Sequence, residues 1–350
     1  MHRTVLQLAA LAGLAAAAFA QPATTTSPAT PTNPAKDSKQ PATSNGKPGG
    51  KQGVKVDAAI ADYKPVEGIT GTVKSIGSDS MINLMTAWSE DFKKFYPSVQ
   101  TEIEGKGSGT APPALIENQA QFGPMSRPMK ADEIKKFEDK FGYKPTEIRT
   151  AVDTLAVFVH KDNPLEEISL EQIAKVYSVK GPDMTWGDLG VTGDLAGQPI
   201  ALYGRNSASG TYGYFKERAL SKSDFKNSVK EQPGSSAVVQ AVGTDAAGIG
   251  YSGVGYLTAD VKVLKVRATP KSKAVAPTVE TALNGQYPIA RYLSVYVNKA
   301  PGESLDPLRA EFIKLMLSRQ GQETVIKDGY FPVPAKTIAE DLKKLGLTSN

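Results

Sequence analysis

The sequence predicts an α/β protein in which strands alternate with helices along the folded part of the chain. Three observations support this expectation. Short apolar segments typical of strands recur from about Ile69 onward, segments with helical spacing follow them, and turns rich in Gly and Ser lie between them. This alternation is typical of βαβ units and of mainly parallel sheets. The sequence contains no visible internal repeat.

The first half of the folded region supplies two strand–helix pairs. "TVKSIG" (72–77) predicts a strand that ends at Gly77. Residues 83–97 predict a helix, because their large apolar side chains share one face and Pro97 ends the segment. "VQTEIEG" (99–105) predicts the next strand, and a helix is expected to begin within "GSGTAPPALIENQ" (107–119).

The second half continues the same alternation. "LAVFVH" (155–160) predicts a strand, and Ser169 with Gln172 predicts a capping box at the start of a helix. "PIALYG" (199–204) predicts another strand, which turns into a helix through "GRNSASGT" (204–211). "DPLRAEFIKLMLSRQG" (306–321) predicts a late amphipathic helix closed by Gly321.

The first 65 residues are expected to lie outside the folded domains. Residues 1–20 carry the basic residue Arg3 near their start, continue with an apolar run and end in Ala18-Phe19-Ala20, which is the pattern of a secretory signal peptide. A transmembrane anchor is the alternative, but the apolar run is short and no basic cluster follows it directly. Residues 21–53 lack Val, Ile, Leu, Met and aromatic residues, so residues 21–65 are expected to form a disordered linker.

Composition limits the possible functions. The chain of 350 residues contains no cysteine, so we expect no disulfide, no thiolate metal site and no lipid anchor on a cysteine. The formal net charge of +5 becomes +4 when Arg3 leaves with the signal peptide, and no basic face with interleaved aromatic residues stands out. The sequence therefore predicts a periplasmic or otherwise extracytoplasmic protein that does not bind nucleic acid.

Three turns with similar composition carry the predicted chemistry. "GSDSM" (77–81), "GKGSGT" (105–110) and "GRNSASGT" (204–211) each follow a strand and open a helix. Ligands of α/β proteins lie at the carboxyl ends of strands, where helix N-termini offer free N–H groups to anions. For any single turn, ordinary N-capping by Ser78, Ser108 or Ser207 is the favoured explanation. The recurrence of such turns, together with Arg205 and the "SRPM" segment (126–129), predicts a site for a small tetrahedral anion.

Other sites of known type are excluded or disfavoured. The sequence has no G-x-x-x-x-G-K-[ST] loop and no G-x-S-x-G elbow. "GIGYSG" (248–253) matches G-x-G-x-x-G but lacks the acidic residue expected about 20 positions further on, so we interpret it as a tight strand-to-loop passage. The only histidines are His2 and His160, which excludes a multi-histidine metal site, and His160 is expected to be structural.

The ordered set of motifs resembles the PstS-type phosphate-binding proteins of ABC transporters. The segments that carry this resemblance are "GSDSMINLMTAWSEDFKKFYP", "GKGSGT", "SRPMKADEI", "LAVFVHKDNPL", "LYGRNSASGTYGYFKE", "GIGYSGVGY" and "VAPTVETALNGQYPIARYL". The resemblance implies a type II periplasmic-binding-protein fold, with two α/β lobes joined by a hinge around a ligand cleft. By analogy, residues 66–152 and 276–350 form lobe 1, residues 153–275 form lobe 2, and the chain crosses near 150–154 and 276–291.

The resemblance also implies which residues bind phosphate. The family's ligand positions correspond here to Asp79, Ser80, Ser108, Gly109, Thr110, Ser126, Arg127, Arg205, Ser207, Ser209, Gly210 and Thr211. The sequence departs from the family at Gln121, where an Asp is usual, at Pro112-Pro113 after the second turn, and at Ser207, which is acidic in some relatives. These departures concern affinity more than ligand class.

Asp79 is the candidate for selecting phosphate. Phosphate near neutral pH carries a proton through which it can donate a hydrogen bond to a buried carboxylate, whereas sulfate carries none and would be repelled. A helix N-cap or first-turn charge is the alternative role of Asp79. The resemblance implies a monomeric receptor that delivers phosphate to a membrane ABC permease, without enzyme activity, cofactor or metal. An exported phosphatase that uses Ser209, or a receptor for sulfate or molybdate, remains the alternative.

Overall fold

The computed structural model describes residues 53–348, all of which belong to one compact unit, residues 45–350. The predicted signal peptide and residues 21–52 of the predicted linker lie outside the described residues. Within the described part of the chain, no helix combines the length and apolar character needed to cross a membrane.

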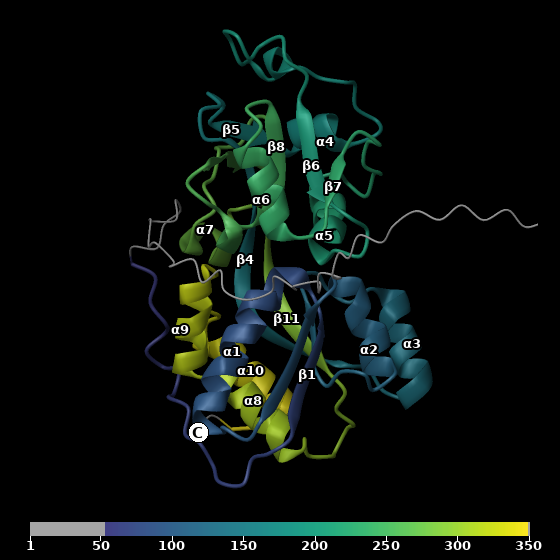
Figure 1. Ribbon diagram of the computed structural model, residues 1–350, viewed down its shortest axis with the longest axis vertical. Coiled ribbons are helices and arrows are strands. Elements are labelled where there is room, and N and C mark those ends of the chain that lie inside the picture. Colours follow the sequence, from purple (N-terminus) through teal and green to yellow (C-terminus); the bar gives the residue numbers. More distant parts are fainter. Residues whose placement is uncertain (1–52, 349–350) are drawn as a thin grey trace, which may run out of the picture. The chain divides into compact units, whose positions relative to one another are not determined.

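The two largest of four apolar cores in the described part of the chain define two lobes (Figure 1), so the predicted two-lobe α/β architecture is confirmed. The core of lobe 1 surrounds Trp88 and Phe312, and it takes residues from 60–152 and from 282–345. The core of lobe 2 surrounds Trp186 and Phe215, and its residues lie between 155 and 289. Lobe 1 is therefore built from both ends of the described chain, with lobe 2 inserted between them.

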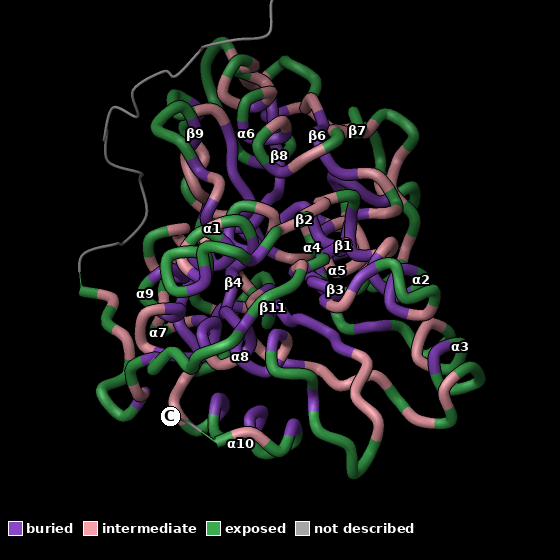
Figure 2. The backbone as a smooth tube through the Cα atoms, turned by 60° about the horizontal axis from the view of Figure 1, so that its bottom comes forward, coloured by how far each residue is buried: buried purple, intermediate pink, exposed green. Residues whose placement is uncertain are grey.

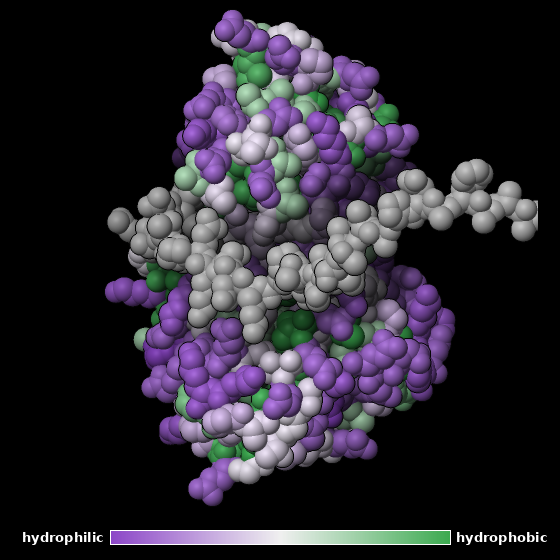
Figure 3. Space-filling model, viewed as in Figure 1, coloured by the Kyte–Doolittle hydropathy of each residue, from purple (hydrophilic) through white to green (hydrophobic). Residues whose placement is uncertain are grey.

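Lobe 1 contains a small parallel sheet with helices packed against it. β1 and β2 pair in parallel, and β3 extends this pairing through a parallel bridge between Ser75 and Phe122. On the face shown in Figure 3, hydrophilic residues dominate the region of α2 and α3. The elements of this lobe are β1 (Thr72–Gly77), α1 (Ile82–Phe95), β2 (Gln100–Gly105), α2 (Ala111–Ile116), β3 (Gly123–Met125), α3 (Ala131–Phe141), α8 (Pro307–Leu317), α9 (Arg319–Asp328) and α10 (Ala335–Leu345).

Lobe 2 repeats the strand–helix alternation. The predicted capping box is confirmed, because the Gln172 N–H donates to Ser169 Oγ over 3.1 Å and the Ser169 N–H donates to Gln172 Oε1 over 2.9 Å. The elements of this lobe are β5 (Glu167–Ser169), α4 (Leu170–Tyr177), β6 (Ala201–Arg205), α5 (Gly210–Arg218), β7 (Lys230–Gln232), α6 (Ser235–Gly243), β8 (Gly248–Gly253), β9 (Val261–Val263) and β10 (Lys265–Arg267).

Two long strands and one short helix connect the lobes. β4 (Thr146–His160) places Ile148 and Val152 in the core of lobe 1 and Leu155 and Val159 in the core of lobe 2. β11 (Ala290–Val297) runs antiparallel to β4, and α7 (Val279–Leu283) precedes it. Figure 2 shows β4 and β11 as largely buried.

The prediction of mainly parallel sheets is wrong for the largest sheet. That sheet has the order β3-β11-β4-β8-β6-β7, with β9 paired to β4. β4 pairs antiparallel with β8, β9 and β11, whereas only β6 pairs in parallel, with β7 and β8. The physical reason is that the chain leaves lobe 1 along β4 and returns to it along β11. Because the two strands lie side by side, they run in opposite directions and pair antiparallel.

The predicted linker extends too far. Residues Ile60 and Tyr63, inside the predicted disordered segment 21–65, are 4% and 5% exposed and belong to the core of lobe 1. The Tyr63 hydroxyl donates to the Glu311 carboxylate over 2.9 Å, and Arg319 donates to the Ile60 carbonyl over 2.7 Å. These apolar side chains bury enough surface to offset the entropy of ordering this part of the chain.

The predicted late helix is two helices. α8 ends at Leu317, and Ser318 adopts an extended conformation and caps α9 by accepting from the Gly321 N–H over 3.2 Å. Gly321 therefore lies inside α9, where a Cβ would overlap the Leu315 carbonyl. The Ser-x-x-Gly sequence here marks a helix start rather than a helix end.

Candidate functional site

The three predicted turns meet at the boundary between the lobes. They follow β1, β2 and β6 and lead into α1, α2 and α5 through short turns. The Gly107 N–H donates to the Gly77 carbonyl over 2.8 Å, which joins the first two turns. The Gly109 N–H donates to the Ala208 carbonyl over 3.0 Å, which joins the second turn to the turn of lobe 2.

Buried hydroxyl groups from these turns contact one another. We call Ser78, Ser80, Ser108, Ser126 and Thr211 the hydroxyl cluster. Ser126 Oγ lies 2.9 Å from Ser78 Oγ and 3.2 Å from Ser108 Oγ, and the Ser126 N–H donates to Ser108 Oγ over 2.9 Å. Ser80 Oγ lies 2.9 Å from Thr211 Oγ1, so the cluster spans both lobes. Each of these residues is at most 1% exposed.

The N-terminus of α5 points at the cluster. Ser209 caps this helix of nine residues, accepting from the Thr211 and Tyr212 N–H groups over 3.2 and 3.4 Å. Gly210 packs so closely that a Cβ would overlap Ser108 Oγ and would lie 2.5 Å from Ser126 Oγ. Only glycine allows the helix start, with its partial positive charge, to approach the hydroxyl cluster this closely.

Arg205 and Asp79 form a buried ion pair between the lobes. Arg205 Nη1 donates to Asp79 Oδ2 over 2.7 Å, and Nη2 lies 2.7 Å from Oδ1 in a contact that lacks hydrogen-bond alignment. Arg205 also donates to the carbonyls of Gln232 and Pro233 and to Ser235 Oγ. Asp79 makes no capping hydrogen bond to its own short helix (Asp79–Met81), but it lies in the first turn of that helix, as the alternative role of a first-turn charge requires.

Two tyrosines support the first turn from outside the cluster. The Tyr330 hydroxyl donates to the Ser80 carbonyl over 2.7 Å, and the Tyr256 hydroxyl donates to the Asp79 carbonyl over 2.9 Å. Burial, followed by the charge of Asp79, raises the pKa of Tyr256, and burial raises the pKa of Tyr330 well above its usual value. Both hydroxyls therefore stay protonated and act as donors that fix the turn.

A second buried ion pair, Arg291–Asp153, was not among the predicted site residues. Arg291 Nε and Nη2 donate to Asp153 Oδ2 over 2.9 and 2.8 Å. The same guanidinium donates to the Ser126 carbonyl over 2.6 Å and to Thr211 Oγ1 over 3.0 Å, so it contacts the hydroxyl cluster directly. The signal that could have found this pair is a charged residue inside each of two apolar strand patterns, "AVDTLAVFVH" and "PIARYLSVYV".

Several predicted residues lie away from the centre of the cluster. Arg127 is engaged by Glu133 through two hydrogen bonds of 2.8 and 2.7 Å and by the Pro128 carbonyl. Thr110 Oγ1 donates to the Gly107 carbonyl, and the Gly109 N–H is used by Ala208. Ser207, in the turn between β6 and α5, is exposed. The structure thus brings together Asp79, Ser80, Ser108, Ser126, Arg205, Ser209, Gly210 and Thr211.

The site combines neutral donors with compensated charges. Each of the three arginines near it is paired with a carboxylate: Arg205 with Asp79, Arg291 with Asp153 and Arg127 with Glu133. Hydroxyls, helix N–H groups and guanidinium groups are the donors that a desolvated oxyanion needs. Within residues 53–348, no group of three or more His, Asp or Glu side chains is placed to hold a metal ion.

Comparison with known proteins gives consistent matches. A family model described as the PBP superfamily domain matches residues 41–320. The chain is 52% identical over 298 residues to the phosphate-binding protein PstS of Pseudomonas aeruginosa, an alignment that covers 83% of this chain and 92% of that protein. It is 31% identical over 293 residues to the phosphate-binding protein PstS of Staphylococcus haemolyticus, covering 83% of this chain and 90% of that protein.

Solved structures show the same fold. A Clostridium perfringens protein, assigned as a phosphate ABC transporter substrate-binding protein and solved with bound phosphate, matches with a TM-score of 0.64 and 29% identity. That alignment covers 75% of this chain and 99% of the other. An ABC-type phosphate transport receptor from Vibrio cholerae matches with a TM-score of 0.60 at 21% identity, covering 75% of this chain and all of the other.

Proposed function

The chain belongs to the PBP superfamily, and we propose that it captures one inorganic phosphate ion between its two lobes and delivers it to a membrane ABC permease. The observation that carries this proposal is the convergence of hydroxyl groups, a helix N-terminus and guanidinium groups from both lobes at one buried place. The P. aeruginosa and S. haemolyticus relatives are phosphate-binding proteins, and the site has the donor groups that phosphate requires.

The ligand would replace contacts that the donors now make with one another. Ser80 with Thr211, and Ser108 with Ser126, are hydroxyl pairs in which one oxygen accepts from its partner. When a phosphate oxygen lies between them, both hydroxyls can donate to it. A buried dianion is tolerated only when all its oxygens are hydrogen-bonded, and donors from two lobes can surround it completely. The backbone N–H groups near Gly210 add the positive end of α5.

Asp79 is proposed to select phosphate over sulfate. Asp79 is 8% exposed and belongs to the turn that contributes Ser80, and its carboxylate contacts Arg205 and Ser235. The P–OH group of hydrogen phosphate can donate a hydrogen bond to this carboxylate, whereas fully ionised sulfate would be repelled by it. Arg205 compensates the charge of Asp79, and its guanidinium would donate to the ligand by exchanging one of the contacts that it now makes.

Capture requires the two lobes to move around a hinge. We place lobe 1 at residues 60–152 and 276–348 and lobe 2 at residues 153–275, with the hinge on β4 and on the segment that contains α7 and the start of β11. This assignment is supported by β4, whose two halves contribute to different cores. The protein is expected to work as a monomer outside the cytoplasm, after removal of residues 1–20 and without a lipid anchor.

An enzymatic role is not proposed. Ser209, the candidate nucleophile of a phosphatase, uses its hydroxyl to cap α5. The only histidine in the described range, His160, lies at the end of β4, where its Nδ1 accepts from the Asp162 N–H over 3.3 Å. The hydroxyls of the site therefore lack a histidine base, and the geometry favours binding without turnover.

Calorimetric titration of the purified protein with phosphate, sulfate and molybdate tests the proposal. We expect one phosphate per chain and much weaker binding of the other two anions. Equal affinity for all three would contradict the assignment of phosphate as ligand. In parallel, the hydrolysis of a chromogenic phosphate ester tests for catalysis, and sustained turnover by the pure protein would favour the phosphatase alternative.

A further inference from the structure

Arg291 lies where the hinge strands meet both halves of the site. Its side chain is 1% exposed and comes from β11, opposite Asp153 in the antiparallel register with β4. From this position its guanidinium donates to the Ser126 carbonyl of lobe 1 and to Thr211 Oγ1 of lobe 2. One group on a hinge strand therefore bridges the two sides of the site.

Asp153 anchors this guanidinium. Its Oδ2 accepts from Arg291, and its Oδ1 accepts from the Val254 N–H over 3.1 Å. Val254 follows β8 and packs against the core of lobe 1 and against a smaller apolar cluster of lobe 2 around Phe158 and Val238. The carboxylate thus joins β4, β11 and the segment after β8, and it holds the Arg291 guanidinium in a fixed orientation.

The start of α5 is attached to β11 in a second way. The Tyr214 hydroxyl donates to the Ala290 carbonyl, and the Arg291 guanidinium lies over the Tyr214 ring at 5.5 Å from its centre. Thr211 and Tyr214 are one helical turn apart, so both contacts fix the same end of α5. When lobe 2 moves away from lobe 1, Arg291 cannot keep its contacts with both lobes. Either α5 loses its contacts with Arg291 and Ala290, or Arg291 loses its hydrogen bond to the Ser126 carbonyl.

We infer that Arg291 is a positioning residue that couples closure of the site to the hinge. This inference rests on the proposed function, because closure matters only if a ligand is captured between the lobes. In the closed arrangement the guanidinium satisfies acceptors on both lobes and on β4 at once. When the lobes separate, one of its buried N–H groups loses its acceptor, which favours the return to the closed arrangement.

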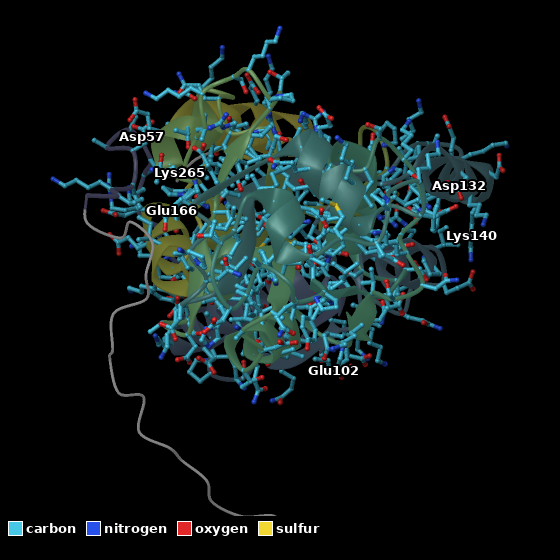
Figure 4. All side chains as sticks on the ribbon, turned by 90° about the horizontal axis from the view of Figure 1, so that it is seen from above. Asp57, Glu102, Asp132, Lys140, Glu166 and Lys265 are labelled. Atoms are coloured by element: carbon cyan, nitrogen blue, oxygen red, sulfur yellow. The ribbon has the colours of Figure 1, made fainter. Side chains whose placement is uncertain are left out.

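The closed population can be measured with spin labels, because the natural chain has no cysteine. We choose Asp132→Cys on α3 and Glu217→Cys on α5, both exposed, and Figure 4 shows Asp132 at the edge of the molecule. These helices lie near each other across the lobe boundary, and Arg127 connects them. A Cβ at Gly213 of α5 would lie 3.2 Å from Cδ of Arg127, and the guanidinium of Arg127 binds Glu133 of α3. Electron–electron double resonance then reports the distance between the lobes with and without phosphate.

The variants Arg291→Met and Arg291→Lys are compared with a matched control, Asp341→Asn. The control weakens another buried pair, in which Asp341 binds Arg149 in lobe 1, away from the site. We expect Arg291→Met to bind phosphate at least about tenfold more weakly and to retain a long interlobe distance in saturating phosphate. Arg291→Lys should be intermediate, because an ammonium group can reach Asp153 but cannot bridge Ser126 and Thr211. The control should lose stability while phosphate affinity and closure stay unchanged.

An Arg291→Met variant that reaches the wild-type distance in saturating phosphate would overturn the inference. If Arg291→Met does not fold, Arg291→Lys decides, since full closure by the lysine variant contradicts a bridging role and incomplete closure supports it. If the natural protein does not bind phosphate, the proposed function fails, yet the coupling is still tested by the distances without ligand. A longer distance in Arg291→Lys than in the natural sequence supports the coupling, and equal distances refute it.

Discussion

Two buried arginine–aspartate pairs, Arg205–Asp79 and Arg291–Asp153, have similar contacts but connect the chain in different ways. Arg205 and Asp79 come from different lobes, and their atoms approach to 2.7 Å. Arg291 and Asp153 come from neighbouring strands in register, and their atoms approach to 2.8 Å. Lobe opening separates the first pair, whereas the second pair stays together as long as the strands are paired.

The comparison shows that the fold, and not the chemistry of the pair, decides its role. A pair that spans the lobes can exchange partners with a ligand, so its free energy is available for binding. A pair within a sheet stabilises the fold whether or not a ligand is present. Five experiments can test or sharpen this distinction, and they are ordered by expected effect.

The largest effect is expected on stability from Asp153→Ala. This change leaves the Arg291 guanidinium buried without its carboxylate, which should cost about 3–5 kcal/mol of unfolding free energy even in the absence of phosphate. Asp79→Ala should cost less, because the partner Arg205 keeps two carbonyl acceptors and the lobes can separate to admit water. Urea unfolding of both variants without phosphate measures their unfolding free energies. Equal losses of stability would contradict the expected difference between the two pairs.

The next effect is expected on binding from Arg205→Ala. Removal of a donor to a buried anion should weaken phosphate binding by about 3 kcal/mol, roughly a hundredfold. Arg205→Lys keeps the positive charge but loses the planar guanidinium group, so its phosphate affinity should lie between those of the natural protein and of Arg205→Ala. Calorimetry gives the three dissociation constants, and an unchanged constant for Arg205→Ala would remove this residue from the site.

Gly210→Ala tests how closely α5 must approach lobe 1. The added methyl group would overlap Ser108 Oγ, so closing the site should cost about 1–3 kcal/mol and weaken phosphate binding accordingly. Gly213→Ala, one turn further along α5, is the matched control, because its Cβ would lie 3.2 Å from the flexible Arg127 side chain. Similar losses of affinity for the two variants would show that the substitutions act through the helix and not through the site.

Asp79→Asn tests the proposed discrimination between anions. The amide removes the charge that repels sulfate, so we expect the preference for phosphate over sulfate to fall by about 1–2 kcal/mol, roughly tenfold. Competition calorimetry with the two anions measures this ratio at constant pH. A ratio equal to that of the natural protein would exclude Asp79 as the acceptor of the phosphate proton.

The smallest effect concerns acid stability and a pair outside the site, Arg149–Asp341. Burial by itself would raise the pKa of Asp341, but hydrogen bonds from Arg149 and Lys344 outweigh it and hold the pKa below its usual value of 3.8. A carboxyl with a lowered pKa contributes stability above the pKa of the unfolded chain, about 3.9, and loses it as the pH falls through the folded-state pKa.

Asp341→Asn should therefore be less stable than the natural protein at pH 7, and the difference should shrink below about pH 4. Thermal unfolding between pH 2 and 7 measures this difference. A constant difference across that range would mean that the pair contributes through packing rather than through charge.

The sequence predicted most of the turns that form the candidate site. Ser80, Ser108 and Thr211 lie together because each follows a strand and opens a helix, an arrangement that the local pattern specifies. The sequence did not predict Arg291 and Asp153, which lie inside strands, where local patterns indicate only burial. Their pairing depends on the register of β4 against β11, and these strands are separated by more than a hundred residues.

Arg127 is a residue to which the local sequence pattern assigned a binding role that its contacts in the structure do not show. The motif around it resembles an anion-binding turn, but the structure pairs Arg127 with Glu133 at the start of α3. The two residues are six positions apart, and they meet because Arg127 lies beside the first turn of α3. The role of Arg127 as a phosphate ligand therefore remains a prediction.

The sequence by itself determined the α/β alternation, the helix starts and the chemical type of the turns, because backbone geometry and capping depend on neighbouring residues. Only the tertiary structure decided the antiparallel crossing of β4 and β11, the partners of each arginine and the burial of Ile60 and Tyr63. The physical reason is that charge pairing and packing depend on distances between residues far apart in the chain, and folding fixes those distances only when both lobes are formed.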